Sequence, residues 1–255
     1  MAREQVSSIL RALQILECFT DQETEWTLKA LVDRLGLPTT TVFRQVSTLT
    51  DRQYLTQDPV RKSYQVGPRL VQLASAILSQ SDLRRLARPE LERLSDTLQE
   101  TINLSILLEY DIFYLDKVET RRSVVCNTRI GSRAPAYATS SGKVMLSAMD
   151  DAALDRFCQW MEQRAHSLTT HTITDPARLR AELIQARHTG YAMDDGEIEE
   201  GLICFAAPIC DMDRKVIAAV SVSGPEYRMR EEREMMIREI KQAGANISRL
   251  MGYLH

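Results

Sequence analysis

Polar side chains gather at three places in the second half of the chain, and each place adjoins an element that could hold them in position. Residues 140–143 come just before a predicted helix, so backbone N–H groups there could bind an anion. Asp194 and Asp195 follow Gly190, which is predicted to end a helix, and are expected to lie in a turn. The third place lies on two strands predicted to pair and comprises Cys204, Ser221 and Ser223.

Ser221 and Ser223 alternate with valines, so both hydroxyls should face one side of the sheet. Two hydroxyls, a thiol and backbone amide donors would suit a small polar ligand that carries a carboxylate. The residues alone favour a plainer interpretation, in which the serines are solvated at a strand end and Cys204 is a small core residue. In that interpretation the serine before the helix is only its N-cap.

The same segments lack the arrangements that catalysis or a bound metal would need. Residues 221–224 read S-V-S-G, without the glycine two positions before the serine that a nucleophile elbow requires. The Gly142-Lys143 pair is not part of a phosphate-binding loop, and His166 and His171 have no cysteine pair beside them. Adjacent aspartates in a turn are common and do not by themselves make an acid–base site. We therefore expect no catalytic residue, no metal and no cofactor.

The elements that position these residues change character along the chain. The first part is predicted to form three short helices and a hairpin, over about Ser7–Phe19, Leu28–Leu35, Thr39–Arg52, Tyr54–Gln57 and Ser63–Val66. Further helices are predicted over about 68–80, 83–97, 141–148, 151–164, 176–189 and 231–253, and strands over 101–109, 112–119, 123–129, 202–209 and 216–223. Strands in hairpins with helices segregated around them indicate an α+β fold with an antiparallel sheet.

Two short helices separated by Gly36-Leu37-Pro38 are typical of a helix-turn-helix. In the second helix, one apolar stripe at helical spacing should face inward, formed by Val42, Val46 and Leu49. Four residues at the N-terminal end of this helix should point outward, where they could contact base edges: Thr39, Thr40, Thr41 and Arg44. This arrangement favours contact with DNA; the alternative is a small helical domain with a capped surface helix.

The hairpin after this helix supplies a basic turn, in which Arg61 and Lys62 are placed to meet backbone phosphate. Residues 34–69 carry six basic and two acidic residues, on a chain whose net charge is −3. A basic segment on a mildly acidic body favours a local nucleic-acid contact, although so small an excess could arise by chance.

Composition narrows the class of protein further. The chain has 255 residues, of which 44% are hydrophobic and 26% charged; this ordinary balance of a globular protein excludes a disordered or fibrous chain. No apolar run approaches the roughly 18 residues that a membrane helix needs. Five scattered cysteines without a C-x-x-C pair indicate reduced thiols, so we expect a cytoplasmic protein that contacts no membrane.

Four segments carry a further signal in their order along the chain: LVDRLGLPTTTVFRQVSTLTDRQYL, ATSSGKVMLS, GYAMDDGEIEEGLICFAAPI and SVSGP. Together they resemble the IclR family of bacterial transcription regulators, with Thr40 where serine is usual. The resemblance implies a winged helix-turn-helix DNA-binding domain over residues 1–67, a linker helix over 68–81 and a GAF-like effector-binding domain over 82–255. It also implies double-stranded operator DNA as a partner, and assembly as a homodimer or a dimer of dimers.

By matching position, the resemblance places the family's effector contacts on Ser141, Gly142, Asp194, Cys204, Ser221 and Ser223. The family's known effectors are mostly small carboxylates, and the few aromatic residues near these segments favour an aliphatic oxo, hydroxy or sugar acid. The resemblance thus implies a regulator whose operator affinity is modulated by such an acid. The alternative is a small-molecule-binding or hydrolase-like sensor without DNA function, which the Thr39–Arg44 helix and the basic hairpin disfavour.

Overall fold

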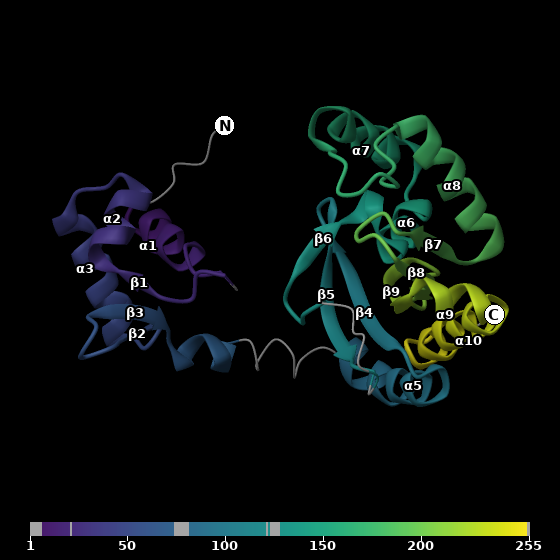
Figure 1. The fold of residues 1–255 in the computed structure, drawn as a ribbon, viewed down its shortest axis with the longest axis horizontal. Coiled ribbons are helices and arrows are strands. Elements are labelled where there is room, and N and C mark those ends of the chain that lie inside the picture. The colour runs from purple at the N-terminus through teal and green to yellow at the C-terminus, as the bar shows by residue number, and fades with distance from the viewer. Residues whose placement is uncertain (1–6, 21, 74–81, 121, 123–127, 254–255) are drawn as a thin grey trace. The chain divides into compact units, whose positions relative to one another are not determined.

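The computed structural model describes residues 7–20, 22–73, 82–120, 122 and 128–253. They fall into two compact units, one within residues 1–81 and one within residues 82–255 (Figure 1). Each unit has its own cluster of buried hydrophobic side chains, so each can hold its own elements in place.

The first unit combines three helices with a small antiparallel sheet. The helices are α1 (Ser7–Glu17), α2 (Leu28–Leu35) and α3 (Thr39–Asp51), and the strands are β1 (Trp26–Thr27), β2 (Leu55–Gln57) and β3 (Ser63–Val66), in the order β1-β3-β2. The predicted helices and hairpin are confirmed to within a few residues. The sequence does not predict β1, because two residues are too short to show an alternating pattern.

The turn between α2 and α3 is fixed by local backbone chemistry. The Thr27 side chain accepts a hydrogen bond from the Ala30 N–H and caps α2. Gly36 ends α2 in the left-handed region, at φ +63°, and its N–H donates to the Val32 carbonyl. The predicted stripe of α3 is buried in the core of this unit, which contains Ile15, Leu31, Val42, Val46 and Leu49. The core therefore holds α3 from one side and leaves the other side exposed.

The second unit is built on one six-stranded antiparallel sheet. Its strands are β4 (Thr101–Leu108), β5 (Asp111–Val118), β6 (Arg133–Pro135), β7 (Ala192–Asp195), β8 (Leu202–Cys210) and β9 (Val216–Pro225), in the order β6-β5-β4-β9-β8-β7. Its helices are α5 (Asp82–Leu98), α6 (Ser140–Ser147), α7 (Asp151–Arg164), α8 (Pro176–Thr189), α9 (Glu226–Glu231) and α10 (Arg233–Leu250), with a 3-10 turn η1 (Ala136–Ala138) before α6. Figure 1 shows α5 and α10 on one side of the sheet and α6 on the other. The predicted α+β class with an antiparallel sheet is confirmed.

Two predicted elements fall partly outside the described residues. Residues 68–73 are helical, whereas the rest of the predicted 68–80 helix is not described. Most of the predicted strand over 123–129 is not described either, and Thr128 and Arg129 lie outside any strand. Within the described part, β6 is the strand that pairs with the outer edge of β5.

The prediction that Asp194 and Asp195 lie in a turn is wrong. They end β7, where Asp194 lies opposite Cys204 of β8. The error has a physical cause: β7 is a four-residue edge strand whose buried face carries Ala192 and Asp194, so it lacks the alternation of apolar residues that marks a strand. The turn begins one residue later, at Gly196, with φ +73°.

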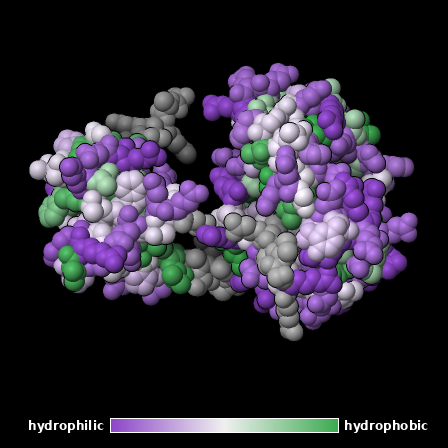
Figure 2. Space-filling view, viewed as in Figure 1, coloured by the Kyte–Doolittle hydropathy of each residue, from purple (hydrophilic) through white to green (hydrophobic). Residues whose placement is uncertain are grey.

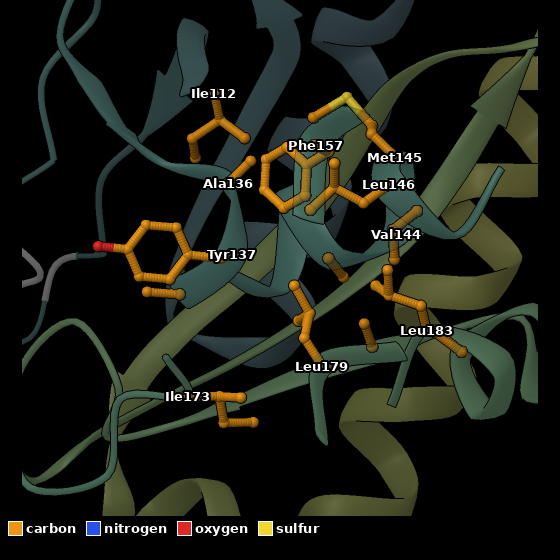
Figure 3. Close-up of a cluster of buried hydrophobic side chains, with 14 of the residues drawn as sticks. Ile112, Ala136, Tyr137, Val144, Met145, Leu146, Phe157, Ile173, Leu179 and Leu183 are labelled. Atoms are coloured by element: carbon orange, nitrogen blue, oxygen red, sulfur yellow. The ribbon is translucent and has the colours of Figure 1, made fainter. Parts of the chain in front are cut away.

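α6 is buried along its whole length because it packs between the sheet and the outer helices. Figure 3 shows Leu146 of α6 beside Phe157 of α7, and Val144 of α6 beside Leu183 of α8, in this core. The first turn of α6 also lies against η1. A Cβ on Gly142 would stand 2.2 Å from the carbonyl oxygen of the first η1 residue, so only glycine fits there.

We expect Gly142→Ala to destabilise the second unit by about 3 kcal/mol, because the added methyl group must displace the η1 backbone. Gly201→Ala is the matched control. Gly201 has φ +78° and nothing within 4 Å of the added Cβ, so its loss should be only about 1 kcal/mol of backbone strain. Urea unfolding followed by circular dichroism measures both variants. Equal losses would contradict the close approach of α6 and η1.

Candidate functional site

A cavity of about 350 Å³ lies in the second unit beside the N-terminus of α6 and strands β7, β8 and β9. The structure brings five of the predicted effector residues to this one cavity: Ser141, Asp194, Cys204, Ser221 and Ser223. They come from the consecutive strands β7, β8 and β9 and from α6, which lies well before these strands in the sequence. The order of strands in the sheet and the packing of α6 against it are what bring them together.

The strand register puts the two serines on one wall of the cavity. Ser221 lies opposite Ala206 of β8 and Asn103 of β4, and Ser223 lies opposite Cys204 of β8. Residues opposite each other in a sheet, and residues two apart along a strand, share one face. Both hydroxyls and the Cys204 side chain therefore lie on the same face. The serines are 3% and 4% exposed, so a ligand that reached them would be largely removed from water.

Gly142, by contrast, is not among the residues that line the cavity, and its N–H is engaged: it donates to Thr139 Oγ1 at 3.0 Å. The expected amide donors therefore shift toward the start of the helix. Ser140 and Ser141 line the cavity in the first turn of α6, where a helix leaves N–H groups without an intrahelical acceptor.

Asp194 is buried in the cavity wall, and the turn after β7 holds its carboxyl group. Oδ1 accepts a hydrogen bond from the Glu197 N–H at 2.7 Å. Burial raises the pKa of Asp194 to about 7; the Glu197 N–H bond opposes this rise, the Glu197 carboxylate adds to it, and the Lys143 ammonium opposes it. Near neutral pH, a large share of the Asp194 carboxyl groups is therefore protonated and can donate a hydrogen bond.

Lys143 ties α6 to the connection between β7 and β8. Its Nζ lies 2.5 Å from Glu182 Oε2 and 3.2 Å from the Met193 carbonyl oxygen, and it also donates to the Glu197 carboxylate. The lysine is 1% exposed, so its charge is compensated inside the protein. It is absent from the cavity lining in the described residues, and its contacts are with the structure around the cavity.

Asn103 of β4 is a site residue that sequence reasoning misses. It is 1% exposed, its Nδ2 donates to Ser223 Oγ at 3.4 Å, and its Oδ1 accepts from Thr128 Oγ1 at 2.8 Å. Thr128 itself lines the cavity. The pattern T-I-N-L along a predicted strand could have pointed to Asn103. It puts Thr101 and Asn103 on one face of the strand, as the alternation in β9 does for Ser221 and Ser223.

Arg133 of β6 is the only basic side chain among the described residues that line the cavity. Its guanidinium donates to the Leu108 carbonyl at 2.9 Å and lies 3.5 Å from the Asp111 carboxylate. The pair with Asp111 is long and its two side chains are 45% and 37% exposed, so the guanidinium could add to the hydroxyl and amide donors that an anion would meet in the cavity.

The predicted DNA-contacting residues of α3 lie on the exposed side of the first unit. Thr39, Thr40 and Arg44 are exposed, and Thr41 is half-buried. Phe43 stands beside them, outside the buried stripe, with 53% of its surface exposed. α3 therefore presents hydroxyl, guanidinium and apolar groups together to the solvent.

The turn between β2 and β3 presents the two predicted wing residues, Arg61 and Lys62, which are both exposed. Asp58 shapes the turn: its Oδ1 accepts hydrogen bonds from the Val60 and Arg61 N–H groups at 2.7 and 2.9 Å, and these bonds lower the pKa of Asp58. The Arg61 guanidinium lies 3.5 Å from Glu25, yet its side chain is 71% exposed and free to exchange that partner for a phosphate.

Other classes of site find little support in the described residues. They contain no group of three or more His, Cys, Asp or Glu side chains that could hold a metal ion. The four described cysteines, Cys18, Cys158, Cys204 and Cys210, are not in disulfide bonds. In the same part of the chain, no helix has the length and apolar character needed to cross a bilayer. Figure 2 shows apolar residues as small separate patches among hydrophilic ones.

Both units match known protein families. Residues 8–59 match the family model of the IclR helix-turn-helix domain, and residues 75–249 match that of the bacterial transcriptional regulator IclR C-terminal domain. The chain is 32% identical to the HTH-type transcriptional regulator XynR of Escherichia coli K12, over 97% of this chain and 98% of that protein. It is 34% identical to KdgR of the same organism, also an HTH-type transcriptional regulator, over 98% and 94%.

Solved structures show the same likeness. The structure of Thermotoga maritima IclR has a TM-score of 0.80 and 26% identity, covering 98% of this chain and 100% of that one. An IclR homologue from Microbacterium hydrocarbonoxydans, complexed with 4-hydroxybenzoate, has a TM-score of 0.84 and 26% identity, covering 95% and 98%.

The raised pKa of Asp194 should make the stability of the second unit depend on pH. The folded form keeps this proton up to about pH 7, whereas an unfolded aspartate releases it near 3.8. The folded state thus binds more protons between these values, and its free energy of unfolding should fall as the pH rises from about 4 to about 7. Asp194→Asn keeps an acceptor for the Glu197 N–H and should lose this component, which is worth up to about 4 kcal/mol.

Urea unfolding of both proteins at about pH 5 and about pH 8 measures the effect. The variant should gain stability relative to the wild type as the pH rises. Parallel pH profiles of the two proteins would show that Asp194 titrates normally in the folded state.

Proposed function

Because the chain belongs to the IclR family of bacterial transcriptional regulators, we propose that its first unit binds operator DNA and that a small carboxylate, bound in the cavity of its second unit, modulates this binding. The observation that carries the effector half is the convergence of Ser141, Asp194, Cys204, Ser221 and Ser223 on one cavity of about 350 Å³. Such a volume suits a small metabolite.

The chemistry of the cavity wall supports a carboxylate as the ligand. Ser221 and Ser223 offer two hydroxyl donors from one strand face, and the N-terminus of α6 adds N–H groups at the positive end of the helix dipole. A protonated Asp194 would donate to the ligand instead of repelling it. The structural neighbour complexed with 4-hydroxybenzoate, itself a carboxylate, adds support from outside this chain.

The surface of the first unit supports contact with DNA. In α3, exposed threonine hydroxyls can bond to bases or phosphates, and Arg44 can reach phosphate or guanine. The exposed ring of Phe43 offers an apolar contact for a thymine methyl group. In the β2–β3 turn, Arg61 and Lys62 provide cations for the DNA backbone, as expected of a wing.

Association of copies would complete the DNA-binding surface. One copy of α3 covers few base pairs, so a homodimer or a dimer of dimers would let two copies read a two-fold related site. α1 carries apolar side chains beyond those its own core buries: Ile9, Leu10 and Leu13 are 59%, 42% and 49% exposed. These residues favour a partner chain against α1.

We expect Arg44→Ala to weaken operator binding by about tenfold or more at matched salt, because one charged contact to base or phosphate is lost. The operator is first obtained by selection from a random-sequence duplex library, and binding is measured by fluorescence anisotropy. Arg214→Ala is the control: it removes the same charge from an exposed turn of the second unit. If both variants bind like the wild type, α3 does not read the operator through Arg44.

The effector site has its own test. A thermal-shift screen of small organic acids identifies a ligand, and calorimetry measures its affinity for the wild type and for Ser223→Ala. The variant leaves a carboxylate short of one donor, so its affinity should fall roughly 10- to 150-fold, while operator binding without ligand stays unchanged. Ser95→Ala, which alters a buried serine of α5 outside the cavity, should bind the acid normally. Undiminished affinity in Ser223→Ala would place the effector elsewhere.

A further inference from the structure

The side-chain amide of Asn103 forms hydrogen bonds with two hydroxyl groups of the cavity wall. Asn103 is 1% exposed; its amide lies between Ser223, at 3.4 Å, and Thr128, at 2.8 Å. Both hydroxyl-bearing residues line the cavity. Asn103 itself sits on the inner strand β4, opposite Ser221 of β9 and Lys117 of β5. Because both edges of β4 are paired, the backbone of Asn103 cannot turn away from the two hydroxyls.

An amide has one donor end and one acceptor end, so it imposes opposite roles on the two hydroxyls. Ser223 Oγ accepts from Nδ2, and its own hydrogen is left for a ligand. Thr128 Oγ1 gives its hydrogen to Oδ1 and is left with lone pairs toward a ligand. Turning the amide by 180° exchanges the two roles and keeps them opposite. The Asn103 amide therefore presents the cavity with one hydroxyl that donates and one that accepts.

We propose that this pair selects acids that carry a hydroxyl group over their oxo counterparts. The inference rests on the proposed binding of a small carboxylate in this cavity. A carboxylate oxygen and an oxo oxygen only accept hydrogen bonds, whereas a hydroxyl group also donates one. A hydroxy acid can satisfy both hydroxyls of the pair, while an oxo acid gives the accepting hydroxyl of the half-buried Thr128 no donor and so forms one hydrogen bond fewer. Ser221 and the first turn of α6 serve the remaining carboxylate lone pairs in either case.

Matched sets of acids test this selection, because each set differs only in the group of interest. The probes are lactate, pyruvate and propionate; 3-hydroxybutyrate, acetoacetate and butyrate; and 4-hydroxybenzoate, 4-formylbenzoate and benzoate. Calorimetry with the full-length protein gives the affinity of each probe. In the set that binds, the hydroxy acid should bind up to about tenfold more tightly than the oxo acid, as expected for one additional hydrogen bond.

The Thr128 side chain provides the decisive variants. Thr128→Val keeps the branched shape but removes the accepting hydroxyl, and with it the donor to Asn103 Oδ1. The ratio of the two affinities should therefore fall to about one through loss of hydroxy-acid binding. Thr128→Ser restores a hydroxyl and should restore the preference. Thr128 lies outside any helix or strand, so both variants should fold; operator binding without acid confirms this.

The outcomes separate the two proposals. If the oxo or the unsubstituted acid binds as tightly as the hydroxy acid, or if the preference survives Thr128→Val, the hydroxyl selection is overturned and the carboxylate site stands. If no acid of any set binds the wild type, the proposed carboxylate site is itself overturned, and this inference falls with it.

Discussion

A buried ammonium group holds the wall of the cavity in place. Lys143 is 1% exposed, and the cost of removing its charge from water is several kcal/mol, so the fold must keep carboxylates beside it. Glu197 and Glu182 meet this requirement, and the Met193 carbonyl adds a third acceptor. Since the Glu197 N–H in turn donates to Asp194, the position of one cavity residue follows from the charge balance of a residue outside the cavity.

The sheet supplies the rest of the wall through its register. β9 lies between β4 and β8, so Ser221 faces Asn103 on one side while Ser223 faces Cys204 on the other. A shift of one residue in either ladder would turn both serines toward the opposite face, against α5 and α10. The alternation of hydrophobic residues that fixes the core therefore also fixes which polar side chains face the cavity. The first turn of α6 forms another wall of the cavity, and Gly142 allows this turn to pack closely against η1.

Local patterns predict most of this fold, and long-range contacts account for what they miss. The stripe of Val42, Val46 and Leu49, the caps of α2 and the pairing face of the two serines follow from spacings within a few residues. Sequence analysis predicts a turn at Asp194 because β7 is short and can be recognised as a strand only by its pairing with β8. Sequence analysis does not identify Asn103, because its hydrogen-bond partners Thr128 and Ser223 lie 25 and 120 residues away along the chain. Sequence analysis could thus name five residues that line one cavity, but not the hydrogen bonds that link the cavity wall to its surroundings.

For the proposed regulator, which must be stable both with and without a bound carboxylate, the neutral donors of the cavity have a physical advantage. A free lysine or arginine in the cavity would bind an anion strongly, but would leave a buried unpaired charge whenever the anion departs. Hydroxyls and a helix N-terminus avoid that cost, and the one basic side chain of the described lining, Arg133, is 45% exposed and lies 3.5 Å from Asp111. Burial raises the pKa of Asp194 to about 7, so this carboxyl group could take up a proton if the proposed carboxylate bound. One buried negative charge would then replace another instead of adding to it. A carboxylate bound as proposed would change the hydrogen bonds around β7 and the first turn of α6, the two elements that the contacts of Lys143 join. Only the part of that change that differs between DNA-bound and free protein can alter operator affinity.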